Sequence, residues 1–285
     1  MLRYQKCSHC RLDFPTTLPE CPHCGQPRLF PNVEEARSEQ AELYKRYESA
    51  IQAADRGGTE ATVRRFESMA SRSAAVICKS LAFVSELADG TRIFPTFYMM
   101  RDSGMFIPQG SKWDALRGAA DEFFFGQNKG QIRFAALSCE GVGLKNYGES
   151  SMVLGERFIA HRTSLFETNT ARFLDRGGIF HPGKSSAVPP GLRAIWEDRG
   201  RLATAKLEPR INAATTDADF PALLLLQGAT SDDDEYIEAQ IFGPLTIQSF
   251  SEVTLPKVSR RLPASAIKGL TQKLAKLRIP TKSPP

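Results

Sequence analysis

The chain has 285 residues, of which 41% are hydrophobic and 24% are charged, and its formal net charge is +5. This composition is ordinary for a soluble globular protein. No apolar stretch is long enough to span a bilayer, and the N-terminal MLRYQKCSHC lacks the apolar region of a secretory signal, so we expect neither a membrane-spanning nor a secreted protein.

Four cysteines near the start of the chain predict a metal site. They form two C-x-x-C pairs, CSHC and CPHCG, which are separated by ten residues: Cys7, Cys10, Cys21 and Cys24. Two such pairs supply the four thiolates of a tetrahedral Zn²⁺ site. A segment this short has too little apolar surface to fold alone, so metal binding would supply most of its folding free energy. Residues 1–31 therefore resemble the zinc-ribbon class.

The remaining cysteines indicate in which cellular compartment the protein resides. Only Cys78 and Cys139 lie outside the cluster. A cysteine quartet with two isolated thiols fits a reducing environment better than a disulfide framework. We expect a cytoplasmic protein.

Residues 32–90 have the pattern of a long helical hairpin. Asn32 and Glu35 form a capping-box pair, and apolar residues then recur at three- and four-residue steps as far as Ala54. The Gly57-Gly58 pair interrupts the pattern. A second run from Val63 to Leu87 repeats it, so two amphipathic helices are expected to pack antiparallel.

Residues 91–263 are predicted to form an α+β body with a mixed or antiparallel sheet. A helix is expected between Ser111 and Gly126, and strands over residues 131–138, 150–154 and 158–166. A further helix is expected from Pro190 to Ala203, and a short apolar element over residues 220–226. The segment from Gly178 to Ser185 satisfies G-x-x-x-x-G-K-S, but its polar upstream flank and Pro189-Pro190 contradict a phosphate-binding loop. We interpret it as a Gly/Pro-rich loop.

The C-terminal segment, residues 264–285, is predicted to be a basic amphipathic helix and tail. No acidic residue follows Glu252, whereas eight basic residues do, so the rest of the chain carries a net charge of −3. Leucines recur on one face from Leu270 onward. The helix either docks on the body through these leucines or contacts an anionic partner such as nucleic acid, an acidic protein or a lipid surface.

The segment EAQIFGPLTIQSFSEVTLP, residues 238–256, resembles the closing part of toxin-type ADP-ribosyltransferase domains. In that family a catalytic glutamate opens a strand, a short turn or helix follows, and a last strand ends the domain. The resemblance covers about twenty residues and implies NAD as the cosubstrate. Tyr236 stands two residues before the glutamate, where many members carry Glu or Gln.

The resemblance implies roles for five residues. Glu238 corresponds to the catalytic glutamate, which bonds a ribose hydroxyl and stabilises the oxocarbenium-like centre as nicotinamide leaves. Arg162 or Arg133 would hold the NAD phosphates, and His161 or Tyr147 would orient the ribose or stack on nicotinamide.

Three functions are compatible with these patterns. The first is an NAD-dependent ADP-ribosyltransferase-like toxin or defence protein that modifies a nucleic-acid or protein acceptor. The second is a non-enzymatic protein that binds nucleic acid through the ribbon and the basic tail. The third is an adaptor whose ribbon and hairpin mediate assembly. Clustering of His161, Arg162, Tyr147 and Glu238 around one cleft would favour the first.

Overall fold

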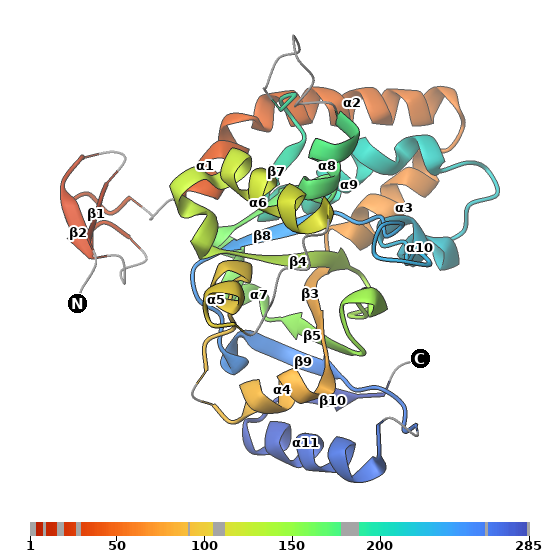
Figure 1. Cartoon of the computed structure of the whole chain (residues 1–285). Coiled ribbons are helices and arrows are strands. Elements are labelled where there is room, and N and C mark those ends of the chain that lie inside the picture. Colours follow the sequence, from red (N-terminus) through yellow and green to blue (C-terminus); the bar gives the residue numbers. More distant parts are fainter. Residues whose placement is uncertain are drawn as a thin grey trace.

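A computed structural model describes residues 4–7, 10–15, 20–26, 30–90, 92–104, 112–177, 188–259 and 262–283. An eight-stranded sheet runs through the middle of the molecule (Figure 1). Its strand order is β10-β9-β5-β3-β4-β8-β6-β7, and all neighbours are antiparallel except β10 and β9. The strands are β3 (Ala74–Lys79), β4 (Ile132–Ser138), β5 (Ser150–Leu154), β6 (Thr163–Phe166), β7 (Arg193–Ile195), β8 (Glu238–Phe242), β9 (Phe250–Thr254) and β10 (Thr281–Lys282).

Eleven α-helices are described, and they gather at the two ends and on the faces of this sheet. Helices α2, α3 and α9 pack together toward the β7 end, α4 and α11 pair beside β9 and β10, and α6 packs on α8. The helices are α1 (Pro31–Ser38), α2 (Gln40–Arg56), α3 (Glu60–Ala70), α4 (Leu81–Ala88), α5 (Phe97–Asp102), α6 (Lys112–Phe125), α7 (Glu156–Ile159), α8 (Thr170–Gly177), α9 (Arg199–Leu207), α10 (Phe220–Leu224) and α11 (Ala264–Lys276). The predicted α+β class is confirmed.

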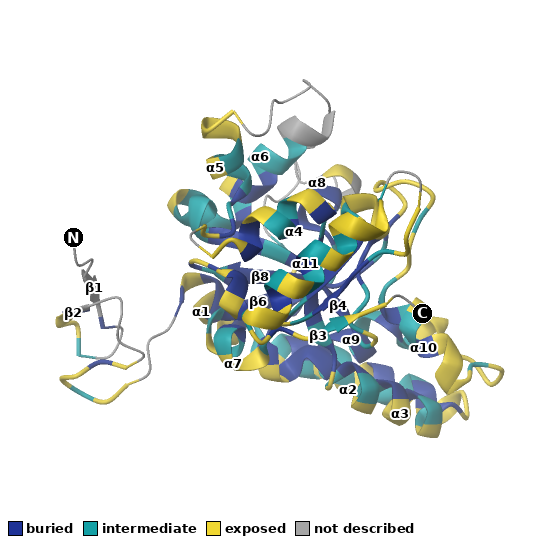
Figure 2. Ribbon diagram, turned by 90° about the horizontal axis from the view of Figure 1, so that it is seen from below, coloured by how far each residue is buried: buried dark blue, intermediate teal, exposed yellow. Residues whose placement is uncertain are grey.

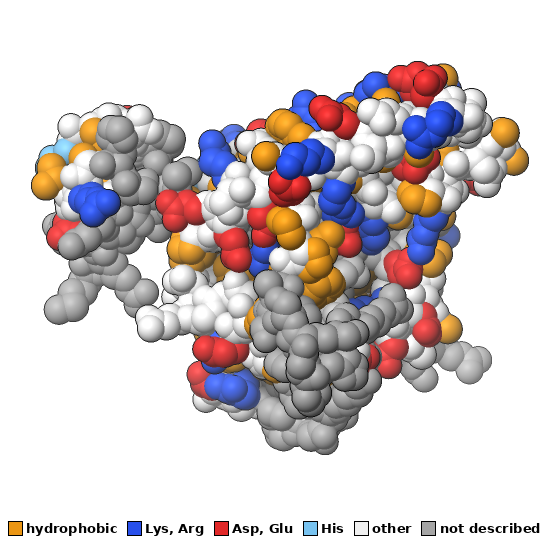
Figure 3. Space-filling view, turned by 90° about the horizontal axis from the view of Figure 1, so that it is seen from above, with side chains coloured by type: hydrophobic (Ala, Val, Ile, Leu, Met, Phe, Trp, Pro, Cys, Tyr) orange, Lys and Arg blue, Asp and Glu red, His pale blue; other side chains and the backbone are white. Residues whose placement is uncertain are grey.

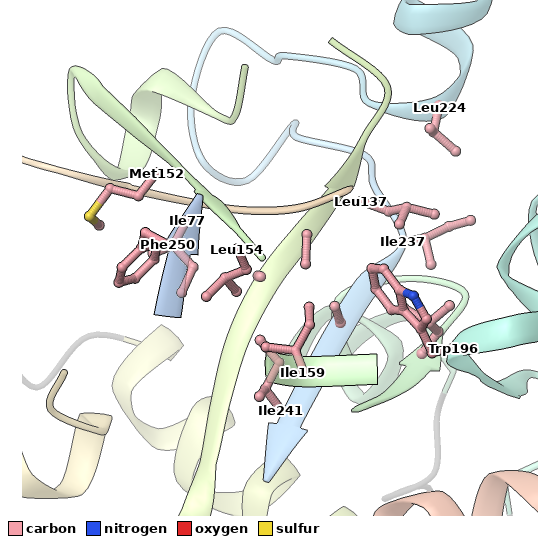
Figure 4. Packing of buried hydrophobic residues seen from close by; sticks show 14 of the residues in the cluster. Ile77, Leu137, Met152, Leu154, Ile159, Trp196, Leu224, Ile237, Ile241 and Phe250 are labelled. Atoms are coloured by element: carbon pink, nitrogen blue, oxygen red, sulfur yellow. The ribbon is translucent and has the colours of Figure 1, made fainter. Parts of the chain in front are cut away.

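One large apolar core joins the sheet to these helices. Figure 4 shows Leu137 and Ile237 close to Trp196, which directly follows β7, with Ile241 further along β8. Figure 2 shows that α2 and α3 turn their buried residues inward and their exposed residues to solvent. Each large apolar side chain buried in this way contributes about 1.5–3 kcal/mol. The core thus fixes the positions of the strand ends that carry the site.

The prediction of a second hairpin helix that continues beyond Ala70 is wrong. The hairpin of α2 and α3 forms around Gly57 and Gly58, the latter with φ +69°, but residues Ala74–Lys79 are strand β3. This strand pairs on both sides and is buried at most positions, so nearly every residue is apolar, and that composition also satisfies a helical period. Helix α4 starts separately, where the Ser80 hydroxyl accepts a hydrogen bond from the Phe83 amide at 3.3 Å.

Two other predicted elements are corrected. Only Thr163–Phe166 of the expected strand over residues 158–166 is extended; the residues before it form α7 and a 3₁₀ turn, η3 (Ala160–Arg162). The helix expected from Pro190 begins at Arg199, because Arg193–Ile195 pairs with β6 as the outermost strand. The glycine-rich segment 178–185 lies outside the described residues.

The tail helix is found where it was predicted, and it docks on the body. Leu270 and Leu274 of α11 are buried against the core. Lys273 pairs with Asp89 at 2.6 Å and donates to the Ser85 hydroxyl at 3.1 Å, both at α4 or its end. The chain then adds β10 parallel to β9. Across the described residues, no helix is long and apolar enough to cross a membrane.

Candidate functional site

A cavity lies where β3 and β4 part. Their ladder joins Ala74 to Ser138 and ends at Val76 and Ala136, although both strands continue. The gap holds a cavity of about 240 Å³, lined by residues 76–79 of β3 and 132–136 of β4. Leu137 donates its amide to Ile237 on the β8 side, so alternation along the strand directs the backbone groups of Phe134 toward the gap.

Glu238, the first residue of β8, lies in the wall of this cavity. Its side chain is fully buried, and its carboxylate accepts hydrogen bonds from the Thr170 hydroxyl at 2.8 Å and from Arg117 Nη2 at 3.4 Å. The Thr170 amide and Gln240 Nε2 each approach at 3.4 Å. A buried carboxylate is costly without such partners, so α6 and α8 fold over β8 to supply them.

Arg117 joins Glu238 to a second buried acid. On α6 it lies one turn before Asp121, whose carboxylate accepts from Arg117 Nη1 at 3.2 Å and from the Tyr98 hydroxyl at 3.1 Å. The guanidinium also lies 4.4 Å from the centre of the Phe134 ring. Burial raises the pKa of Asp121 to about 6. The Arg117 cation lowers this pKa, and the nearby Glu238 carboxylate raises it further. Burial disfavours the Arg117 cation, but the two carboxylates outweigh it and raise its pKa.

Aromatic and amide side chains also line the cavity. Asn169 donates to the Tyr236 hydroxyl at 2.5 Å, and burial raises the Tyr236 pKa well above its ordinary value. Tyr147 is 45% exposed at the rim. A neighbouring cavity of about 200 Å³ shares Arg117, Tyr147 and Asn169 with the first. Ligand sites typically span roughly 300–1,000 Å³, so the two cavities together have the dimensions of a small-molecule site.

The cavity brings together some of the predicted site residues and separates others. Glu238, Tyr147 and Arg133 line it, whereas His161 and Arg162 are not among its described lining residues. Arg162 donates to the carbonyls of Phe158, Phe242 and Pro244 at 2.6–3.0 Å. The His161 ring lies 5.8 Å from that of Phe30. The ligand roles proposed for this pair stay predictions.

Sequence reasoning missed the residues that hold Glu238. Arg117, Asp121 and Thr170 precede it by at least 68 positions. The Arg117–Asp121 spacing on a predicted helix was a signal for an ion pair. Tyr236 was also not predicted as a site residue. Nothing in the sequence pattern indicated its hydrogen bond with Asn169.

The four N-terminal cysteines form a second candidate site, a metal centre. Their sulfurs lie within 4.8 Å of one another, with Cys7 to Cys24 and Cys10 to Cys21 each at 3.6 Å. Two short strands, β1 (Tyr4–Lys6) and β2 (Asp13–Pro15), pair antiparallel beside them. Gly25, after the second C-x-x-C pair, has φ +68°, and Arg11, after the first, has φ +61°. This thiol cluster can bind one metal ion.

No known protein family matches the chain, and no curated protein is significantly similar to it. The residues of these two sites are therefore what indicates the function of the chain.

Proposed function

We propose that the chain is an NAD-dependent ADP-ribosyltransferase-like enzyme of toxin or defence type, which transfers ADP-ribose to a protein or nucleic-acid acceptor. The buried Glu238 carboxylate in the cavity between β3 and β4 carries this proposal. Glu238 opens β8, and a 3₁₀ turn, η7 (Ile247–Ser249), and then β9 follow, which is the order that the resemblance implies.

The charge and support of Glu238 suit the cleavage of a glycosidic bond. A carboxylate beside the anomeric carbon can accept a hydrogen bond from a ribose hydroxyl and stabilise the positive charge that develops as the bond to nicotinamide breaks. The acceptor's oxygen or nitrogen then bonds to that carbon, and its proton passes to a base, a role that Glu238 can fill. Thr170 and Arg117 hold the carboxylate in one orientation.

The cavity walls suit a flat ring that bears an amide. Phe134 and Tyr236 offer aromatic surface, and Tyr147 stands at the rim. The backbone groups that Phe134 directs toward the gap can exchange hydrogen bonds with a carboxamide, as a neighbouring strand would. These features support nicotinamide as the group that enters the gap.

We also propose that the cysteine cluster holds a structural Zn²⁺. A tetrahedral ion with bonds of about 2.3 Å places its sulfurs about 3.8 Å apart, close to the spacings within the cluster. All four positions would be filled by thiolates, which leaves none for a catalytic water. The metal would therefore act by stabilising the fold of residues 1–31.

The test of the enzymatic proposal uses labelled NAD and cell extract. We expect wild type to transfer label and release nicotinamide, and Glu238→Gln to lose both by about 10²–10³-fold, because the neutral amide cannot stabilise the developing charge. Glu252→Gln on β9 is the matched control and should retain activity, since Glu252 pairs with Lys282 outside the cavity lining. Absence of transfer and of nicotinamide release by wild type would remove the proposal.

The alternative of a non-enzymatic nucleic-acid-binding or adaptor protein has less support. Two of the tail lysines, Lys273 and Lys282, are paired with acidic residues of the body. Figure 3 shows basic and acidic side chains interspersed over the face around α2, without a single-sign patch there. Nucleic-acid binding depends mainly on such a basic surface.

A further inference from the structure

The cavity between β3 and β4 also has a basic end, which includes Arg133, one of the two arginines that the resemblance assigns to the NAD phosphates. Lys79 of β3 and Arg133 of β4 both line it. Continuing the register of Val76 with Ala136 past the last pair places Lys79 opposite Arg133. Side chains alternate along a strand, and Glu238 pairs with Ala136, so the two cations leave the sheet on the face opposite to Glu238.

Arg133 is buried without a carboxylate partner among the described residues. Only 5% of it is exposed. Its Nε donates to the Phe94 carbonyl at 2.9 Å, and its Nη1 donates to the carbonyls of Gly243 at 2.8 Å and Gln131 at 3.2 Å. Its Nη2 has the Met99 sulfur as its neighbour, at 3.9 Å, which is a weak acceptor. Burial, and then the like charge of Arg162, lower the pKa of Arg133 to about 10.

Lys79, also without a carboxylate partner among the described residues, is half-buried. Its Nζ lies 5.6 Å from the centre of the Phe83 ring and 5.8 Å from that of Phe94. These rings hold the side chain in place, but in the part of the chain that the structure describes no oxygen accepts a hydrogen bond from the ammonium. Burial lowers the pKa of Lys79. A cation taken from water without a counter-ion is costly, and a bound anion would offset that cost.

The two ends of the cavity therefore differ in charge. At the Glu238 end, Arg117 is balanced by Glu238 and Asp121. At the other end, no carboxylate of the described residues pairs with Lys79 or Arg133. A ligand that complements both ends carries a flat ring at one end and an anion at the other.

We propose that Lys79 and Arg133 form an anion subsite that binds a phosphate group of the ligand whose ring enters the gap. A phosphate presents several acceptor oxygens, so a guanidinium from one strand and an ammonium from the next can reach it together. Lys79 is then a specificity-determining residue, which favours phosphorylated ligands over their dephosphorylated counterparts. That the ring is nicotinamide rests on the proposed function. That an anion binds at Lys79 and Arg133 does not.

The experiment compares nicotinamide mononucleotide with nicotinamide riboside, which differ by one phosphate group. Calorimetric titration should show that wild type prefers the mononucleotide by about tenfold or more, as a charge-assisted hydrogen bond predicts. Lys79→Met keeps the apolar stem between the rings and should abolish most of this preference, and Lys79→Arg should restore part of it. Lys129→Met is the control: Lys129 also lies over a ring, that of Tyr98, but it pairs with Glu122 and does not line the cavity.

The outcomes separate this inference from the proposed function. An unchanged preference in Lys79→Met would overturn the subsite even if both nicotinamide compounds bind. If neither compound binds, binding of inorganic pyrophosphate is measured instead. Binding to wild type that is lost in Lys79→Met supports the subsite while the assignment of the ring as nicotinamide fails. Pyrophosphate that binds neither protein, or both equally, overturns the subsite.

Discussion

The N-terminal unit and the α+β body achieve a fixed structure by different means. In the first, four sulfurs converge beside a two-stranded ribbon, and its buried apolar cluster consists of Phe14 and the cysteines themselves. In the second, a core that spans most of the strands and helices positions a site from residues as far apart as Arg117 and Glu238. A local unit can be recognised from four spaced residues, whereas a distributed one must be assembled before its chemistry is visible. A substitution that unfolds one of the two units should therefore leave the other folded.

The largest expected effect comes from removing one thiol of the cysteine cluster. Cys21→Ser should reduce bound zinc from about one ion per chain to almost none, and residues 1–31 should lose their structure, because structural zinc contributes roughly 10–16 kcal/mol to such units. Metal analysis and amide NMR spectra would measure both changes. Cys139→Ser, at a half-buried position outside the cluster, should keep the metal. Retention of zinc by Cys21→Ser would refute the zinc ribbon.

An intermediate effect is expected from the core of the body. Leu137→Ala removes a fully buried side chain from β4 and should lower the free energy of unfolding by about 2–5 kcal/mol, measured with urea. Val258→Ala, at a position that is 62% exposed, should change it by less than about 0.5 kcal/mol. Zinc affinity should be unaffected by either substitution. A parallel loss of zinc in Leu137→Ala would show that the two units are coupled.

The smallest of the three effects concerns the site, and it depends on pH. Burial raises the pKa of Asp121 from 3.8 to about 6, so between these values the folded chain retains a proton that the unfolded chain has released. Stability therefore falls as the pH rises through this window, by at most about 3 kcal/mol. Asp121→Asn removes this titration. Urea unfolding at pH 4, 5, 6 and 7 should show a smaller decrease for the variant than for wild type.

Asp217→Asn provides the control for this titration, because its carboxylate is 66% exposed and pairs with Arg65 at the surface. Its stability should follow the wild-type pH dependence. If the curves of Asp121→Asn and wild type ran parallel, the buried acid would not be the cause of the pH dependence.

The sequence was sufficient where local patterns determine structure. The spacing of the cysteines, the periodicity of α2, α6 and α11 and the runs that became β4 and β5 all depend on neighbours within a few residues. It was insufficient for β3, because a strand that pairs on both sides is apolar throughout and its pattern does not distinguish helix from strand. Asn32 was expected to cap a helix, but its amide donates to the Gln240 carbonyl at 2.8 Å and anchors α1 to the sheet.

The site was predictable only in part. The role of Glu238 was predicted from a resemblance of about twenty residues and stays a prediction, whereas its burial in a cavity wall was not foreseen. Arg162 was a plausible anion ligand by its residue type, but it is not among the described residues that line the cavity, and its guanidinium donates to main-chain carbonyls. The residues that contact Glu238 come from α6 and α8, and no sequence spacing connects these helices to β8. Long-range packing, which one sequence does not reveal, selects Arg117 and Thr170.

The shortest strand of the sheet has a consequence for self-association. Strand β10 spans two residues, and the carbonyls of Pro280 and Lys282 accept from the amides of Val253 and Leu255. Without it, β9 would present a row of open donors and acceptors to any other extended chain, which is how fibrils are templated. A proline, which has no amide hydrogen, and a charged lysine are poor partners for such growth. Strand β10 thus covers the edge of β9 with a segment that is itself a poor template for a further strand.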